Sequence, residues 1–149
     1  MRVEHINPFI QGTEGILKTV CGVDTKLGKI YKKSQIAAGE YSILIEIVGE
    51  LRGLVYYSMN EKTACNIASK MMMGMPISSL DDMSKSALCE LSNMISGNVA
   101  TIFSGMNIAV DIKPPVFNDG SSPSAAYEFI AIPINLDNSD VLEINVFFL

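Results

Sequence analysis

The sequence predicts an α+β fold, with helices packed on a largely antiparallel six-stranded sheet. Three observations predict it: a long helical pattern occupies the middle of the chain, strand-like segments stand in groups of three on either side, and short turn signals join neighbouring strands. The expected order is therefore helix, three strands, two helices and three strands. Each half has a helix followed by three strands, which suggests a duplicated unit, although the sequence shows no clear repeat.

The first helix is predicted from its start signal. Asn7-Pro8 is typical of an N-cap residue followed by proline at the first helical position, and an apolar stripe then continues to about Gly22. Gly12 and Gly15 either weaken this helix or allow another element to approach it closely.

Six segments have the β-branched or alternating apolar pattern of strands. Two of them, joined across Gly49-Glu50, are a hairpin candidate. The last segment lacks the lysine or proline that guards a free edge, so it is either a paired edge or an internal strand. A polar loop is expected at residues 119–124. The six segments lie within residues 24–31, 42–48, 51–58, 108–113, 127–135 and 141–149.

A second helix is expected between the two groups of strands. Asn60 serves as its N-cap, and it continues to about Met73, where Gly74 ends it. The run Met71–Met73 is interpreted as adaptable core filling, with a contact surface as the alternative.

The longest helix begins after Ser79, whose position three residues before Asp82 resembles a capping box, and runs to about Ser104. Asp81-Asp82 could form a paired-carboxylate site, but at a helix start they are better explained as compensation of the helix dipole. One face of this helix is apolar and comprises Leu88, Leu91, Ile95, Val99, Ile102 and Met106. The opposite face is polar with a single charge and comprises Ser86, Glu90, Asn93, Gly97, Thr101 and Ser104.

Composition limits the classes of function. With 149 residues, 48% of them hydrophobic and 18% charged, we expect a single globular domain over residues 1–149. No apolar run approaches the roughly 20 residues that cross a bilayer, so we expect a cytoplasmic protein without membrane contact. A net charge of −5 and a pI near 4.8 argue against nucleic acid as a partner.

Few residues are equipped for metal or nucleophilic chemistry. Cys21, Cys65 and Cys89 show no metal-binding spacing and are expected to be reduced thiols in apolar positions. His5 is the only histidine, so we expect no metal bound by this chain and no Ser-His-Asp hydrolase.

The polar face of the longest helix is the candidate functional surface. A solvated face normally favours strong helix formers, whereas Ser, Asn, Gly and Thr accept a propensity cost. Gly97 would let the backbone of another molecule come close. Glu90 and Asn93 lie one turn apart and could grip a cation and orient a water molecule. Spacing alone leaves a simpler alternative open, an exposed pair without function.

The spacing Ser-x-x-x-Glu-x-x-Asn at Ser86, Glu90 and Asn93 adds a further indication. With this motif the chain resembles the CheC/CheX/FliY family of phosphatases that act on the chemotaxis response regulator CheY, and the CheX branch in particular. The start Ile6-Asn-Pro-Phe-Ile10 and the segment Asn93-Met-Ile-Ser-Gly-Asn98 are similar as well. Pro114 and Pro115 lie one or two residues earlier than the proline of the family motif.

CheC-like members of the family often carry the motif twice, once in the first helix. Here the comparable segment is identified as Glu14-Gly-Ile-Leu17, which has no asparagine, so one site per chain is expected.

The resemblance implies an enzyme that hydrolyses the phosphoaspartate of a CheY-type receiver domain in two-component signalling. Glu90 would pair with the receiver's lysine, Asn93 would orient the attacking water, and Ser86, Gly97 and Thr101 would contact the receiver. No cofactor is expected on this chain, with Mg²⁺ held by the receiver, and homodimers joined through their sheets are expected. The alternative is a non-catalytic adaptor that binds a receiver domain or a flagellar-switch component. An enzyme acting on a small molecule is less well supported.

Overall fold

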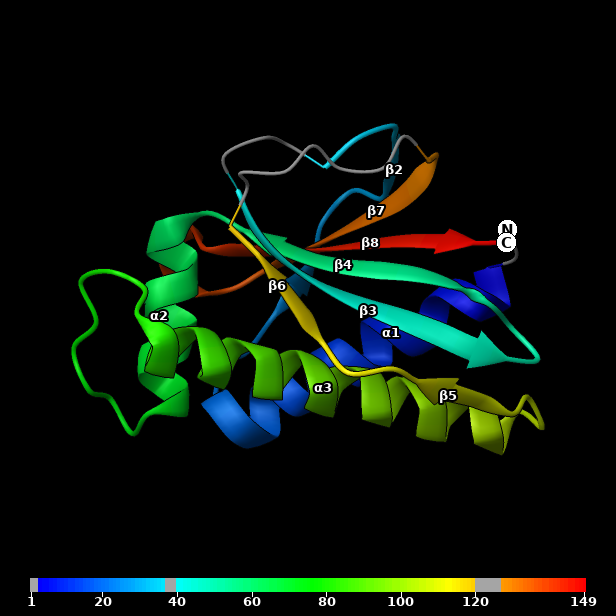
Figure 1. Cartoon of the computed structure of the whole chain (residues 1–149), viewed down its shortest axis with the longest axis horizontal. Coiled ribbons are helices and arrows are strands. Elements are labelled where there is room, and N and C mark those ends of the chain that lie inside the picture. Colours follow the sequence, from blue (N-terminus) through cyan, green and yellow to red (C-terminus); the bar gives the residue numbers. More distant parts are fainter. Residues whose placement is uncertain (1–2, 37–39, 120–126) are drawn as a thin grey trace.

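The computed structural model describes residues 3–36, 40–119 and 127–149. Helices α1 and α3 lie along one face of an antiparallel sheet and α2 stands at one end of it, which confirms the α+β class (Figure 1). The helical elements are α1 (Val3–Ile16), its continuation η1 (Leu17–Cys21), α2 (Glu61–Met71), α3 (Asp82–Gly105) and η2 (Asp137–Ser139). The strands are β1 (Lys26–Leu27), β2 (Tyr31–Lys33), β3 (Tyr41–Gly49), β4 (Gly53–Met59), β5 (Val110–Ile112), β6 (Val116–Asn118), β7 (Phe129–Asn135) and β8 (Val141–Phe148).

The sheet has the strand order β1-β7-β8-β4-β3-β5, with β2 also paired to β7 and β6 also paired to β3. Eight strands therefore fill six positions, and the predicted number of six was wrong because each edge consists of two short strands. Pro114 and Pro115 interrupt one edge, since proline has no N–H to donate. At the other edge Gly28 leaves the strand, and a Cβ there would lie 3.0 Å from Cβ of Pro133.

The strand order is unchanged when the two halves of the chain are exchanged. Replacing β1 by β5, β2 by β6, β3 by β7 and β4 by β8 gives the same sheet read from its other edge. Each set of strands follows its own long helix, α1 or α3 (Figure 1). The duplication suggested by the order of elements is therefore present in the topology.

Strand β8 lies between β7 and β4 in the middle of the sheet. The apolar pattern of residues 141–149 therefore belongs to an internal strand and gives no support for a paired edge. The loop expected at residues 119–124 lies, apart from Asp119, outside the described residues. No helix in the described ranges is both long and apolar enough to cross a membrane.

Helix α1 starts earlier than predicted, at Val3, and contains Pro8. The predicted N-cap at Asn7 was wrong because tertiary contacts stabilise the additional turn. The His5 ring packs edge-on against Phe103 and Phe148, with centroids 6.2 and 6.0 Å apart. A proline in the second turn removes one helical hydrogen bond, and these contacts offset that loss.

Helix α3 is capped by Asp81 and not by Ser79. An Asp81 carboxylate oxygen accepts a hydrogen bond of 2.8 Å from the Ser84 backbone N–H, and the Ser84 hydroxyl accepts one of 2.8 Å from the Asp81 N–H. Both partners of this capping box lie two residues later than predicted, at Asp81 and Ser84 in place of Ser79 and Asp82. A carboxylate at this end agrees with the dipole interpretation of Asp81.

Helix α2 has the predicted N-cap, since the Asn60 side chain accepts a hydrogen bond of 2.8 Å from the Thr63 N–H. The core interpretation of Met71–Met73 was wrong for Met73, which is 99% exposed. That residue follows the helix end and has a left-handed backbone, with φ of 60°, so its side chain no longer follows the helix face.

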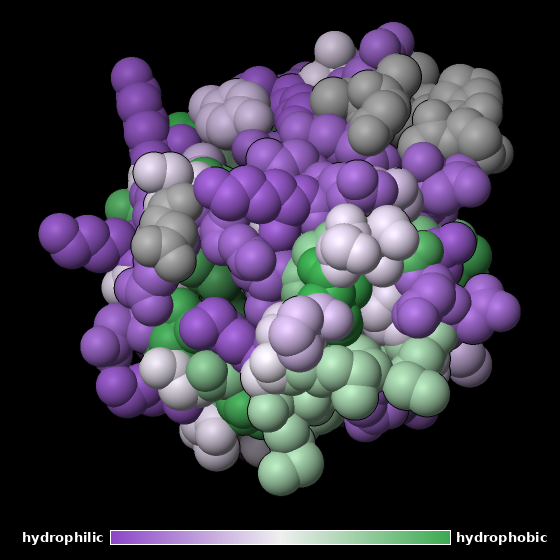
Figure 2. Space-filling view, turned by 90° about the vertical axis from the view of Figure 1, so that its left-hand side faces the viewer, coloured by the Kyte–Doolittle hydropathy of each residue, from purple (hydrophilic) through white to green (hydrophobic). Residues whose placement is uncertain are grey.

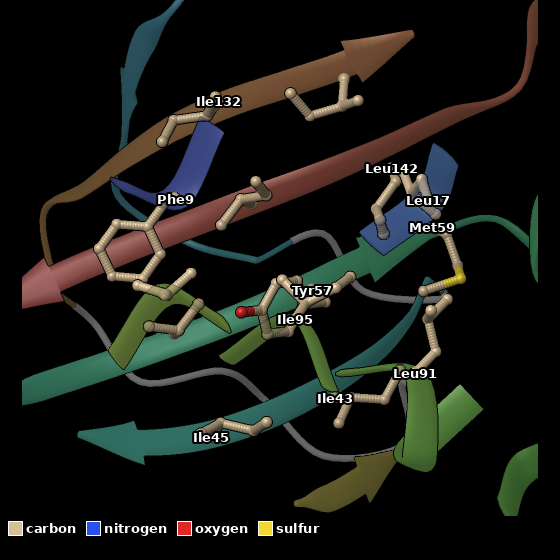
Figure 3. Close-up of a cluster of buried hydrophobic side chains, with 14 of the residues drawn as sticks. Phe9, Leu17, Ile43, Ile45, Tyr57, Met59, Leu91, Ile95, Ile132 and Leu142 are labelled. Carbon is tan, nitrogen blue, oxygen red and sulfur yellow. The ribbon is translucent and has the colours of Figure 1, made fainter. Parts of the chain in front are cut away.

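The core fills the space between the sheet and helices α1 and α3 (Figure 3). Leu88, Leu91, Ile95 and Val99 are buried as predicted. The prediction for Met106 was wrong, because the helix ends at Gly105 and Met106 is 38% exposed. The other core side chains labelled in Figure 3 are Phe9, Leu17, Ile43, Ile45, Tyr57, Met59, Ile132 and Leu142.

Candidate active site

The outer face of α3 has the polarity that the helical wheel predicts. All six residues of this face, which we call the α3 stripe, lie away from the buried side of the helix. Asn93 and Gly97, near its middle, are half-buried. The exposed members are Ser86, Glu90, Thr101 and Ser104.

Glu90 and Asn93 lie within the long helix α3, but their side chains are not engaged by other side chains. Within the part of the chain that the structure describes, neither side chain has a hydrogen-bond or ion-pair partner. A carboxylate that is not neutralised within its own protein remains available to an external cation, and a free carboxamide can both donate to and accept from water. The pair can therefore act on a molecule that docks on this face.

The serines of the opposite side of α3 are engaged internally. The Ser92 hydroxyl donates a hydrogen bond of 3.0 Å to the Leu88 carbonyl. Ser96 Oγ and the Tyr57 hydroxyl are hydrogen-bonded at 2.8 Å, and both residues are buried. Neither serine is placed to act as a nucleophile on an external substrate.

Two glycines differ in what they allow. A Cβ on Gly97 would meet nothing within 4 Å, so packing within this chain does not require a glycine there. Glycine in a helix interior costs about 1 kcal/mol relative to alanine, so Gly97 carries a stability cost that packing within the described chain does not explain. A Cβ on Gly12 would lie 2.7 Å from Val99 Cγ2, which shows that α1 and α3 cross closely there. This confirms close approach as the role of Gly12.

Thr101 lies one turn after Gly97 and is partly engaged by it. Its hydroxyl donates a hydrogen bond of 3.1 Å to the Gly97 carbonyl. The oxygen of that hydroxyl can still accept a hydrogen bond from a docked partner.

An exposed methionine lies beside the start of the α3 stripe, a feature that the sequence did not lead us to expect. Met83 is 65% exposed and precedes Ser86 by one turn, and Met75 is also exposed. Figure 2 shows this end of the molecule, where hydrophobic surface gathers below a largely hydrophilic region. The three-residue spacing from Met83 to Ser86 places the two side chains one helical turn apart, and this could have been recognised in the sequence. Methionine adapts readily to different contact shapes, so this flank suits a docked protein.

The remaining candidates carry no chemistry in the described structure. Cys21, Cys65 and Cys89 are free thiols, as predicted, and burial raises the pKa of each. Pro114 and Pro115 lie in the connection between β5 and β6, which runs along α3 (Figure 1). Among the described residues, no group of three or more histidine, cysteine or acidic side chains could hold a metal ion.

Comparison with known proteins decides the family. Residues 41–140 match the family described as chemotaxis phosphatase CheX. The chain belongs to this CheX family. The CheY-P phosphatase CheX of Thermotoga maritima is 33% identical over 121 residues, which cover 80% of this chain and 78% of the relative. The prediction that the protein is a phosphatase of the CheC/CheX/FliY type is thereby confirmed.

Solved structures of CheX proteins have the same fold. The chemotaxis protein CheX of Desulfovibrio desulfuricans superposes with a TM-score of 0.84 at 25% identity, covering 99% of this chain and 100% of that one. CheX of Borrelia burgdorferi, solved in complex with CheY, BeF₃ and Mg²⁺, gives a TM-score of 0.82 at 25% identity and covers 99% of both chains. The roles of individual residues of the α3 stripe in this chain remain predictions.

Proposed function

We propose that this CheX-family protein hydrolyses the phosphoaspartate of a CheY-type response regulator that docks on the α3 stripe. The observation that carries the proposal is the Glu90–Asn93 pair on the outer face of α3, with Glu90 exposed, Asn93 half-buried and neither side chain engaged within the described part of the chain. The CheX–CheY complex of the Borrelia burgdorferi relative supports a receiver domain as the partner.

Glu90 is proposed to fix the position of the receiver. Its carboxylate would form an ion pair with the receiver's lysine, and a charge-assisted hydrogen bond of this kind contributes about 1.5 to 3 kcal/mol. Ser86, Gly97 and Thr101 would contact the receiver on either side. Gly97 would allow the closest approach, because no side chain projects from it.

Asn93 is proposed to orient the attacking water. Its carboxamide would hold the water in line with the phosphorus while the water oxygen attacks and the bond between phosphorus and the aspartyl oxygen breaks. The receiver regains its carboxylate, and the water's two protons leave with the phosphate as H₂PO₄⁻. Mg²⁺ held by the receiver supplies charge neutralisation of the phosphoryl oxygens. Phosphoryl transfer depends mainly on positioning and electrostatics, so one well-placed carboxamide suffices for catalysis.

The test measures the decay of a phosphorylated CheY-type receiver in Mg²⁺, with and without the protein. We expect acceleration by the wild type, a loss of about 100-fold in kcat for Asn93→Ala, and unchanged binding of that variant to the BeF₃-activated receiver. For Glu90→Ala we expect Kd to rise by about 10- to 100-fold. Glu128→Ala, at an exposed glutamate leading into β7, serves as the matched control.

Two results would contradict these assignments. Equal loss of binding in the Asn93 and Glu90 variants would remove the proposed division of roles. Binding of the phosphorylated receiver without faster decay would instead favour the non-catalytic adaptor.

A further inference from the structure

The end of the molecule where α3 begins exposes three methionine side chains, which we call the methionine group. Met73 and Met75 lie in the connection that leads from α2 to α3, and Met83 lies in the first turn of α3. All three are exposed, whereas Met59 is buried in the core. Figure 1 shows this connection at the end where α3 begins, and Figure 2, which views that end, shows hydrophobic surface gathered there.

Folding of the described chain does not account for Met73. Its side chain is almost fully exposed, and its φ of 60° lies in the left-handed region that favours glycine or asparagine. The turn around it is nevertheless hydrogen-bonded, since the Gly74 N–H donates to the Ser69 carbonyl at 2.8 Å and the Met75 N–H to the Met72 carbonyl at 3.2 Å. An ordered turn therefore presents an apolar side chain to solvent without any gain from burial, and exposed apolar surface of this kind marks interaction sites.

Helical geometry aligns Met83 with the α3 stripe. Met83 precedes Glu90 by seven residues, which is close to two helical turns or about 11 Å along the axis. At about 100° per residue, seven steps return the side chain to within about 20° of the direction of Glu90. A partner that docks on the stripe therefore meets Met83 on the same face.

The size of a protein interface includes Met83 and excludes the other end of the helix. A specific interface covers about 800 Å² on each partner, which corresponds to a circle with a radius of about 16 Å. A receiver centred on Glu90 and Asn93 reaches Met83 within this radius. Met106, which follows Glu90 by 16 residues, lies about 24 Å away along the axis and outside it.

We propose that the methionine group forms the apolar part of the docking surface and binds an apolar surface of the receiver beside its phosphorylation site. This proposal rests on the proposed function and adds a second kind of contact to the polar α3 stripe. Methionine side chains are unbranched and polarisable, so the same group can pack against receivers whose side chains differ at this place.

The methionine group should contribute to binding and not to the chemical step. Met83 precedes Asn93 by ten residues, or about 15 Å along the helix, so its side chain does not reach the phosphoryl group. Apolar surface that is buried at this distance is buried equally in the ground state and in the transition state. Such uniform binding lowers KM and leaves kcat unchanged.

The first test replaces Met73, Met75 and Met83 together by glutamine, which has a similar length but a polar end. We expect this triple variant to raise Kd for the BeF₃-activated receiver, and KM for the phosphorylated receiver, by about 10- to 100-fold with unchanged kcat. Replacement of the same three residues by leucine should recover most of the affinity, because leucine restores the apolar surface. Met106→Gln is the matched control and should leave Kd unchanged. Circular dichroism and urea midpoints verify that each variant is folded.

The second test maps the contact on the wild-type protein with hydrogen peroxide. Peroxide transfers one oxygen to the sulfur of an exposed methionine and leaves as water, and mass spectrometry measures the resulting sulfoxide at each position. The BeF₃-activated receiver should slow the oxidation of Met73, Met75 and Met83 but not that of Met106.

The outcomes separate this proposal from the proposed function. Without acceleration of receiver decay by the wild type, the proposed function itself fails. If the wild type is active and the glutamine variant keeps the wild-type Kd and KM, the methionine contact is overturned. A loss of kcat at saturating receiver would also overturn it, since a docking contact leaves the chemical step intact. Protection from peroxide that appears without the receiver and grows with protein concentration would assign this surface to a second copy of the chain and overturn the proposal.

Discussion

Replacing Gly97 by alanine should stabilise the protein while weakening its docking surface. A Cβ at this position meets nothing within 4 Å, so the substitution adds no clash within the chain. Alanine is favoured over glycine in a helix interior by about 0.8 to 1.0 kcal/mol, which should raise Tm by about 2 to 4 °C for a chain of this size. If a receiver backbone passes over Gly97, the added methyl group should weaken docking by about 1 to 3 kcal/mol.

Gly12→Ala is the matched control because it adds the same methyl group to the inner face of a helix. Its Cβ would lie 2.7 Å from Val99 Cγ2 and 3.3 Å from the Val99 backbone nitrogen. Valine in a helix has one preferred rotamer, so the clash must move α1 away from α3. Overpacking of this kind costs about 1 to 3 kcal/mol, of which the gain in helix propensity offsets about 1.

Urea unfolding measures both stabilities, and titration with the BeF₃-activated receiver measures docking. Gly97→Ala should raise the unfolding midpoint and raise Kd by about 5- to 150-fold. Gly12→Ala should lower the midpoint. An unchanged Kd for a stabilised Gly97→Ala would show that the receiver does not approach this glycine. A lowered midpoint for Gly97→Ala would refute the open space found around it.

Two further predictions concern stability. Tyr57→Phe should lower the free energy of unfolding by about 1 to 2 kcal/mol, because it leaves the buried Ser96 hydroxyl without its partner. Adding Ser96→Ala should recover part of this loss. A double-mutant cycle measured by urea unfolding tests this coupling. Additive losses would contradict the pairing. Hydrogen bonds from the Ser84 N–H and hydroxyl lower the pKa of the Asp81 carboxyl below its ordinary value of 3.8, so its stabilising effect is present above that value and is lost as the pH falls through the lower folded-state pKa. Asp81→Asn should remove this dependence, and parallel urea midpoints of both proteins from about pH 5 to about pH 2 would contradict it.

Local signals predicted the elements whose ends are stabilised locally. Asn60 caps α2 as expected because its side chain reaches an N–H of the same helix. The start of α1 was misplaced because a distant residue contributes to it, Phe148 in contact with His5. The start of α3 was misplaced although its cap is local, because Ser79 with Asp82 and Asp81 with Ser84 have the same spacing and only the second pair forms the capping box. The break at one sheet edge depends on the neighbouring strand, where Gly28 lies beside Pro133. The break at the other edge follows from Pro114 and Pro115 within the edge itself.

Helical spacing was sufficient to place Glu90 and Asn93 on the outer face of α3. The order of the strands in the sheet could not be predicted in the same way, because contacts between distant segments decide it. Its recognition required the pairing of strands more than 60 residues apart, such as Ile47 with Ile112. That information belongs to the folded sheet and not to any local segment.

The exchange of edge strands between the two halves has a consequence for how the chain acquires its structure. β1 hydrogen-bonds to β7 and β5 to β3, so neither half can complete its share of the sheet alone. Lys26 cannot pair with Asn135 until the chain has been synthesised more than 100 residues further. Contacts of such long sequence separation give a high contact order, which slows folding toward the range of about milliseconds to seconds. During synthesis, the outer edge of β3 stays unpaired until β5 and β6 leave the ribosome, and over that interval the nascent chain is open to pairing with other strands.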